Sequence, residues 1–425
     1  MSGDARSDAE MSGAIADAVG QAARAAADAP GLYETLLRDG WTTVGIAEGE
    51  GGSGGDLADA VEVAAAIASA GIGLPVADTA IVAARLLTAD GIRLPGTARC
   101  VVPACAPDAT TSAGTVSAYV RRVPWASWAS HLALACPAGP ERTAIVLLEA
   151  AGAVISRGAN LADEPRDDIR LIDVPAAAVV VVDRPYSDVA GEVLAAGALA
   201  RSVQLAAAAR QVLEMTSRYC TERVQFGRPI AGWQAVQQQL AELAAETAAA
   251  RAAVALALAA VTGATAGAMT GATARSTTGA VTGAVTGSMT NAVTGAVTEI
   301  ATAKARTSQA AGLVAGIAHQ LHGAIGVTRE HPLQRYTRAL WSWREEYGTQ
   351  AYWSQVLATR LAGHEEDLWG WLTARDLEPG SPTGDTASGR SHAARLRARE
   401  CGAPVVGRGL DEPVRRHLQH GTACA

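Results

Sequence analysis

The hydrophobic positions divide the chain into stretches with different periods. Residues 195–218 carry apolar side chains at helical spacing, which predicts a helix there. Gly227 and Pro229 then interrupt the period, and a second helix is predicted to begin at Gln234. Ala-rich sequence with polar interruptions also predicts helices over residues 1–95, where Asp56 follows a glycine-rich loop and is a good helix N-cap.

Residues 96–185 have another pattern, with short apolar runs between clusters of Gly, Pro and Asp. Such runs predict strands of a compact β domain, and they cover residues 100–102, 114–120, 132–135, 144–148 and 178–182. The chain is therefore predicted to be mostly α within the α+β class. We expect an N-terminal helical domain over 1–95, a middle β domain over 96–185 and a C-terminal helical domain over 186–373.

Two further segments lack the pattern of a packed core. Residues 261–298 repeat a unit of the Ala-Val-Thr-Gly kind, and each Gly destabilises a helix by about 1 kcal/mol relative to Ala. We predict a poorly ordered or marginally helical insertion without chemistry of its own. Glycine at every fourth position also occurs in membrane helix dimers, but Leu and Ile are absent here, so we do not expect a membrane partner. Residues 374–425 are polar and aperiodic, which predicts a disordered tail.

Composition narrows the classes of function. A net charge of -7 argues against nucleic acid as a partner. The six cysteines are scattered without a Cys-x-x-Cys pair, so we expect reduced thiols in a cytoplasmic protein and no metal site. The first ten residues contain no apolar core, and no secretory signal is predicted. Lys304 is the only lysine among 35 basic side chains, an imbalance more typical of coding bias than of function.

Candidate chemistry centres on the corner between the two helices that flank Gly227. Arg223, Gln225 and Phe226 lie there, and Phe226 is the only phenylalanine of the chain. An arginine, an amide and a lone aromatic at one corner can hold a phosphate and stack on a planar ring. The alternative, from spacing alone, is a capped helix corner with a buried Phe226.

A resemblance to a known family favours the binding site. The run Arg223-Val-Gln-Phe-Gly-Arg-Pro-Ile230, followed by Trp233-Gln-Ala-Val-Gln237, resembles the C-terminal domain of the acyl-CoA dehydrogenase family. A second block from Gln320 to Arg335 agrees with this resemblance, which covers most of residues 185–365. It implies two helical domains around a β domain, the last of them a four-helix bundle, with FAD as the cofactor.

The resemblance also implies roles for individual residues. Arg223 would contact the flavin pyrophosphate across a subunit interface, with Gln225 and Phe226 near the flavin ring. Gln320 and Gly323 would approach the adenine end of the cofactor. The β domain departs from the family because its usual Thr-Glu-Pro-x-x-Gly-Ser loop, which supplies flavin contacts, is not found.

The catalytic base is the second departure. The family's reaction needs a carboxylate to remove the α proton while the flavin accepts a hydride from the β carbon. One usual position lies directly before a Gly-Thr pair, where this chain has Tyr347 before Thr349, itself a candidate flavin contact. A second position falls near Gly197, which also lacks a carboxylate. Glu346 is the remaining catalytic candidate, and the alternative for Glu345 and Glu346 is a solvated or arginine-paired face.

The prediction is an acyl-CoA dehydrogenase-like flavoprotein that oxidises the Cα–Cβ bond of an acyl-CoA thioester, from a fatty acyl or sterol side chain. We expect an electron-transfer flavoprotein or a similar acceptor. We also expect a homo-oligomer or a heterotetramer with a related dehydrogenase subunit. Two alternatives stay open: a non-catalytic partner subunit of a heteromeric acyl-CoA dehydrogenase, and a flavin-free interaction protein.

Overall fold

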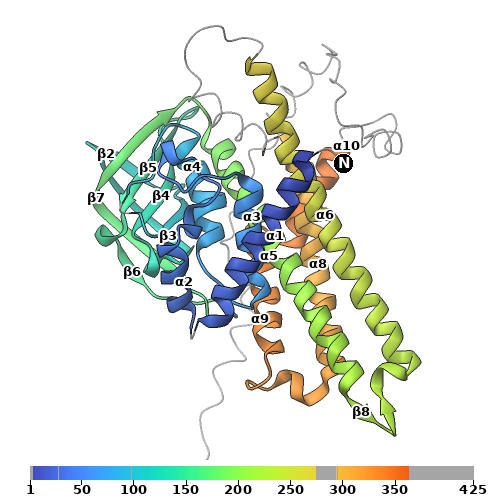
Figure 1. Ribbon diagram of the computed structural model, residues 1–425. Helices are drawn as coiled ribbons and strands as arrows, with labels where there is room; N and C mark the ends of the chain where they lie inside the picture. The colour runs from blue at the N-terminus through green and yellow to red at the C-terminus, as the bar shows by residue number, and fades with distance from the viewer. Residues whose placement is uncertain (1–2, 27, 97, 274–292, 294, 363–425) are drawn as a thin grey trace, which may run out of the picture. The chain divides into compact units, whose positions relative to one another are not determined.

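A computed structural model describes residues 3–26, 28–96, 98–273, 293 and 295–362, all within one compact unit. Most of the predicted repeat and the whole predicted tail lie outside these residues. The described part contains helices at both ends of the sequence and a sheet between them (Figure 1). This order confirms the predicted mostly helical α+β fold.

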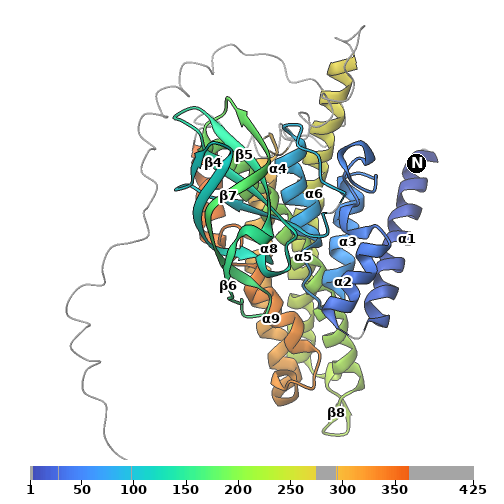
Figure 2. The same cartoon turned by 90° about the vertical axis from the view of Figure 1, so that its left-hand side faces the viewer.

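The N-terminal part is helical. It contains α1 (Gly3–Ala25), α2 (Ala29–Arg38), α3 (Leu57–Ser69), the π-helix η3 (Asp78–Ala83) and α4 (Ala84–Thr88), with short 3-10 turns η1 (Trp41–Thr43) and η2 (Glu48–Glu50). Asp56 caps α3 as predicted, since its carboxylate accepts from Ala58 N at 2.8 Å and from Asp59 N at 3.2 Å. Figure 2 shows α3 between α1 and α5, and its buried face contacts both helices.

The sheet has the order β1-β4-β5-β7-β3-β2, with β6 paired to β7. Its strands are β1 (Val101–Cys105), β2 (Thr110–Ser112), β3 (Thr115–Pro124), β4 (His131–Pro137), β5 (Thr143–Glu149), β6 (Val154–Ser156) and β7 (Arg166–Val182). Two further 3-10 turns are η4 (Ala126–Trp128) and η5 (Ala150–Gly152). The β1–β4 pair is parallel, and the other pairs of this sheet are antiparallel.

Both faces of the central strands are buried, which explains their continuous apolar runs. Along β4, Leu132 and Leu134 point into a core shared with α1, α2 and α3. Ala133 and Ala135 alternate with them and point into a core shared with α4 and α5. The sheet is thereby fixed between the N-terminal helices and the first helix of the C-terminal part.

The C-terminal part is built on three long helices. It contains α5 (Tyr186–Glu222), the hairpin strands β8 (Val224–Gln225) and β9 (Arg228–Pro229), η6 (Ile230–Gly232), α6 (Gln234–Thr273), α8 (Val297–His322), η7 (Gly323–Val327), α9 (Leu333–Trp343) and α10 (Gln350–Ala362). α5, α6 and α8 are long and apolar enough to cross a membrane by length and composition alone. Their apolar side chains pack against one another, and the apolar window of α5 is 78% buried.

The sequence missed several elements. The short strands β2 and β6 and the hairpin β8–β9 were not predicted, and β7 begins at Arg166 instead of near residue 178. α6 continues through residues 261–273, the first part of the predicted insertion. At the other end of that insertion Val293 is buried. Both ends of the predicted segment 261–298 therefore belong to the packed helical part.

Candidate functional site

The corner after α5 is a two-residue β-turn. Gln225 pairs with Arg228, so Phe226 and Gly227 form the loop of a tight hairpin. Both have positive φ, 52° and 81°, as a type I′ turn requires. An aromatic residue rarely adopts this backbone region. The Phe226 side chain is 89% exposed and its ring meets the Trp233 ring edge to face, so the alternative of a capped corner with a buried Phe226 is wrong.

The end of α8 lies beneath the same hairpin. The Tyr219 ring stacks on His322 with centroids 4.4 Å apart, and the Tyr219 hydroxyl donates to the His322 carbonyl at 3.4 Å. This contact brings Gln320 and Gly323 to the end of the bundle that carries Arg223. The two sequence blocks that resemble the family therefore meet in one exposed region, which we call the hairpin end.

The other predicted site residues lie far from the hairpin end. Gly197 lies in α5 and Arg223 is the C-cap of the same helix, 26 positions further along, which at 1.5 Å per residue is about 39 Å. Gly197 contacts Tyr347. The chain thus holds its predicted site residues in two groups: the hairpin end and the turn from Arg344 to Thr349 that follows α9.

Glu346 in that turn sits in a cluster of charges. Its Oε1 accepts from Arg166 Nε at 2.7 Å and from Asn160 Nδ2 at 2.9 Å. Its Oε2 accepts from Arg166 Nη2 and from Arg201 Nε, each at 2.7 Å. Arg166 belongs to β7 and Arg201 to α5, so Glu346 ties the turn to the sheet and to the bundle. Its side chain is 13% exposed and arginine-paired.

Tyr347 joins the two positions at which the family places its base. A Cβ added to Gly197 would lie 2.0 Å from Tyr347 Cδ1, so the ring occupies the space beside that glycine. The Tyr347 hydroxyl donates to Asp78 Oδ1 at 2.8 Å. Asp78 in turn accepts from Arg201 Nη2 at 3.0 and 3.1 Å. A phenol and a buried ion pair therefore stand where a free carboxylate would act.

The protonation of these groups is unsuited to proton abstraction near neutral pH. Burial alone would raise the pKa of Glu346, but the charges of Arg201 and Arg166 outweigh it and lower that pKa to about 2. A carboxylate with so low a pKa is a weak base. Burial and the neighbouring Asp78 raise the pKa of Tyr347 well above its ordinary value, so its phenol stays neutral. Burial also raises the pKa of Glu164, which accepts from Arg166 and Trp343.

A pocket of about 520 Å³ lies between the sheet and this turn. Its volume is within the range of small-molecule sites. Pro124, Leu161 and Trp341 give it apolar walls, and Arg122 is a polar group on its lining. Asn160 and Arg166 on the same lining already bind Glu346. Trp125 packs in the core, and the Arg166 guanidinium lies over its ring.

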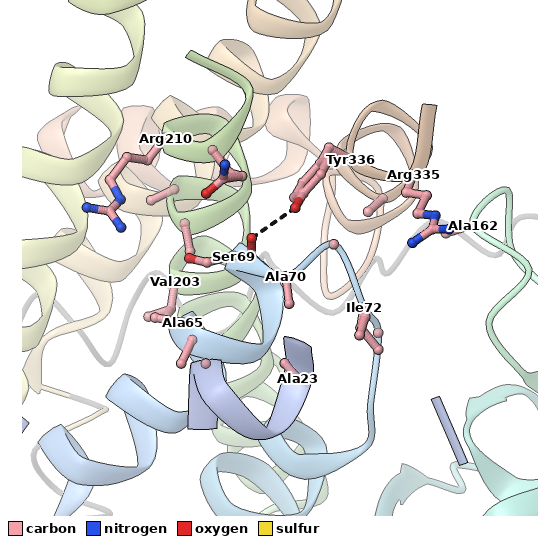
Figure 3. Close-up of a pocket in the computed structure, with 18 of the residues that line it drawn as sticks. Ala23, Ala65, Ser69, Ala70, Ile72, Ala162, Val203, Arg210, Arg335 and Tyr336 are labelled. Atoms are coloured by element: carbon pink, nitrogen blue, oxygen red, sulfur yellow. Dashed lines mark hydrogen bonds between the residues drawn. The ribbon is translucent and has the colours of Figure 1, made fainter. Parts of the chain in front are cut away.

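A larger groove of about 1540 Å³ contains none of the predicted site residues. Figure 3 shows it lined by small side chains such as Ala23, Ala65 and Ala70. The Tyr336 hydroxyl donates to the Ser69 carbonyl at 3.0 Å beside it (Figure 3), which links α9 to the end of α3. The groove therefore lies between the N-terminal and C-terminal helices, away from the turn.

Comparison with known proteins finds one protein family and several solved structures that are similar to this chain. Residues 187–362 match the family model described as acyl-CoA dehydrogenase, C-terminal domain. No curated protein matches the chain. The ChsE4-ChsE5 complex from Mycobacterium tuberculosis is 20% identical with a TM-score of 0.65, covering 85% of this chain and 98% of that one.

Two further solved structures have the same fold. Butyryl-CoA dehydrogenase from Megasphaera elsdenii is 18% identical with a TM-score of 0.66, covering 83% of this chain and 98% of that one. The steroid ACAD Tcur3481-Tcur3483, a G363A variant, is 19% identical with a TM-score of 0.62, covering 84% and 99%. These structures share the fold of this chain, and residues 187–362 match the C-terminal domain of the acyl-CoA dehydrogenase family.

Proposed function

We propose that this chain is the non-catalytic subunit of a heteromeric, FAD-dependent acyl-CoA dehydrogenase. The observation that carries the proposal is the packing of Tyr347 on Gly197, backed by the Asp78–Arg201 ion pair. Both base positions lack a carboxylate, and the nearby Glu346 is held by two arginines. Glu346 thus has a structural role in this proposal, in place of the catalytic role predicted from the sequence.

The hairpin end is the part that this subunit offers to a partner. The tip exposes Arg223, Gln225 and Phe226. It lies about 39 Å along α5 from Gly197, where the turn from Arg344 to Thr349 packs on the helix. An exposed aromatic in a strained backbone conformation is typical of a functional position. We infer that this end completes a flavin site whose catalytic carboxylate belongs to a related dehydrogenase chain.

The chemistry of the residues fits the cofactor at that end. The Arg223 guanidinium can bind a pyrophosphate, Phe226 can lie on a ring, and Gln320 and Gly323 sit beside them for the adenine half. Thr349 would contact a flavin at the turn instead. FAD, when bound, supplies the hydride acceptor, and this chain's residues bind and orient it.

The names of two similar structures support a complex of two different dehydrogenase subunits. ChsE4-ChsE5 and Tcur3481-Tcur3483 are each named as a pair of proteins, and the second as a steroid enzyme. We therefore propose a cytoplasmic complex that acts on acyl-CoA thioesters, with sterol side chains as the first substrate class to test. Its electrons would pass to an electron-transfer flavoprotein or a similar acceptor.

The test is to purify the chain alone and after co-expression with a related dehydrogenase subunit that carries the glutamate. We expect little bound flavin in the visible spectrum of the chain alone, and no reduction of a dye by acyl-CoA. The co-expressed complex should contain flavin and reduce the dye. Replacing the partner's glutamate by glutamine should abolish this activity while the flavin remains bound.

Dye reduction by the purified homo-oligomer would contradict the proposal. A complex that forms without any flavin would instead favour the flavin-free interaction protein. The visible spectrum and the dye assay thus separate the three functions.

A further inference from the structure

Lys304 is buried in α8, and its ammonium meets the end of α9. Nζ donates to the Arg344 carbonyl at 2.8 Å, to Ser308 Oγ at 3.0 Å and to the Trp343 carbonyl at 3.4 Å. An ammonium has three donors, and here each of them has an acceptor. The carbonyls at a helix C-terminus have no partner within the helix and attract a cation.

The identity of Lys304 is informative because the chain has arginine at all its remaining Lys or Arg positions. Coding bias accounts for the excess of arginine, but not for the one lysine that is kept. The three acceptors around Nζ converge on one point in a fully buried site, and Ser308 Oγ also donates to the Arg344 carbonyl at 3.2 Å. A compact ammonium fits this arrangement, whereas a planar guanidinium fork does not.

We propose that Lys304 is a positioning residue whose side-chain amino group fixes the end of α9 and, with it, the turn that carries Glu346 and Tyr347. The turn follows directly, since Glu346 N donates to the Trp343 carbonyl at 3.2 Å. Tyr347 then adopts a φ of 51°, a conformation that an aromatic residue keeps only when its surroundings hold it. This inference goes beyond the proposed function, because the turn needs this support whether or not the chain binds flavin.

The charges around Lys304 make the support depend on pH. Burial and the charge of Arg201 lower the pKa of Lys304 to about 7; among the weaker influences Arg344 acts in the same direction, and Glu346 and Glu345 oppose it. Above that pH the neutral amine keeps two N–H donors for the acceptors around it and no longer carries a buried charge. Because folding lowers this pKa, the opened and hydrated turn binds a proton that the closed turn does not bind. The closed turn therefore becomes more stable as pH rises above about 7 and less stable as pH falls.

The first measurement uses the full chain without substitution. Lysine labelled with ¹³C at Cε gives one NMR signal, because the chain has one lysine. We expect this signal to titrate near neutral pH, far below the value of about 10.4 for a free side chain. Hydrogen exchange of the peptide covering residues 343–353, after correction for intrinsic exchange rates, should slow roughly tenfold for each pH unit above the transition, because opening the turn then takes up one proton.

Variants separate positioning from packing. Lys304→Met keeps the volume and should give fast exchange in that peptide at every pH, and Lys304→Arg should not restore the slow exchange. The control is Arg306→Met on the same helix, which breaks a partly exposed ion pair with Glu246 and should leave the peptide unchanged. If Lys304→Met does not fold, the two measurements on the unsubstituted chain decide.

Three results would overturn the proposal. One is a lysine signal that titrates near pH 10, and another is exchange of residues 343–353 that does not depend on this titration. The third is a wild-type exchange profile in Lys304→Arg. None of these results depends on flavin content, so the outcome is independent of the proposed function.

Discussion

Substitution of Glu346 by glutamine tests whether this residue holds the structure or performs catalysis. The carboxylate accepts four hydrogen bonds from Arg166, Arg201 and Asn160. Its pKa is about 2 against an ordinary value of about 4.5, and at about 1.36 kcal/mol per pKa unit this is about 3 kcal/mol. Removing one partner of a buried pair costs about 3–5 kcal/mol. Asp78 stays beside Arg201, so we expect the lower end.

The assay is urea denaturation of the full chain at pH 7, with Glu345→Gln as the control. Glu345 pairs with Arg344 at the surface, so its loss should change the unfolding free energy by less than about 0.5 kcal/mol. Because the pKa of Glu346 is lowered on folding, its stabilisation is complete above about pH 4.5 and is lost as pH falls towards 2. That acid-induced loss should be smaller by about 3 kcal/mol in Glu346→Gln. Unchanged stability together with abolished dehydrogenase activity would refute this reasoning and identify Glu346 as the base.

Three further predictions concern the hairpin end and the repeat. In the complex, Arg223→Ala should weaken flavin binding roughly tenfold to hundredfold, as for the loss of one charge-assisted hydrogen bond. The control is Arg210→Ala, which removes another exposed arginine. Equal flavin content in the two variants would contradict the role of Arg223 in flavin binding. Phe226→Ala should leave the unfolding free energy of the chain alone within about 0.5 kcal/mol but weaken assembly, as size-exclusion chromatography would show. Replacing residues 264–292 by a short Gly-Ser linker should change stability by less than about 0.5 kcal/mol. A longer deletion that removes buried Val293 should cost about 2 kcal/mol in the same denaturation assay.

The long elements could be predicted because their signals are repeated along many residues. The helical period before residue 218 and the start of the second helix at Gln234 correspond to α5 and α6. The predicted strand runs overlap β1, β3, β4, β5 and β7, two of them starting one residue early. The hairpin β8–β9 escaped because each strand has two residues, too few to show an alternation. Its turn also uses Phe226 where a sequence rule expects Asn, Asp or Gly.

An arginine-paired Glu346 was one of the two alternatives, but its buried partners were not predicted, although the sequence holds a signal for two residues of the cluster. Asp78 is the one charged residue between Glu62 and Arg85, and Arg201 is the one between Glu192 and Arg210. A lone charge inside a long apolar run must be buried and paired, because an isolated buried charge is too unfavourable. Its partner cannot be named from the sequence, since Asp78 and Arg201 meet only through the packing of η3 on α5.

The two positions that lack a catalytic carboxylate, Gly197 and Tyr347, share one space, and a double-mutant cycle can measure their coupling. Gly197→Ala places a methyl group 2.0 Å from Tyr347 Cδ1, and such overpacking of a buried site costs about 1–3 kcal/mol. In a Tyr347→Ala background the methyl group has room, so the same substitution should become neutral, or favourable by up to about 1 kcal/mol because Ala suits a helix better than Gly. The coupling measured by urea denaturation should therefore be about 1–4 kcal/mol. Gly191→Ala, on the same helix with nothing within 4 Å, is the control and should not couple to Tyr347. Equal effects of Gly197→Ala in both backgrounds would mean that the ring and the helix do not share this space. With coupling, a glutamate at position 197 and an aromatic ring at position 347 exclude each other. Restoring a base on α5 would then require the loss of Tyr347 first.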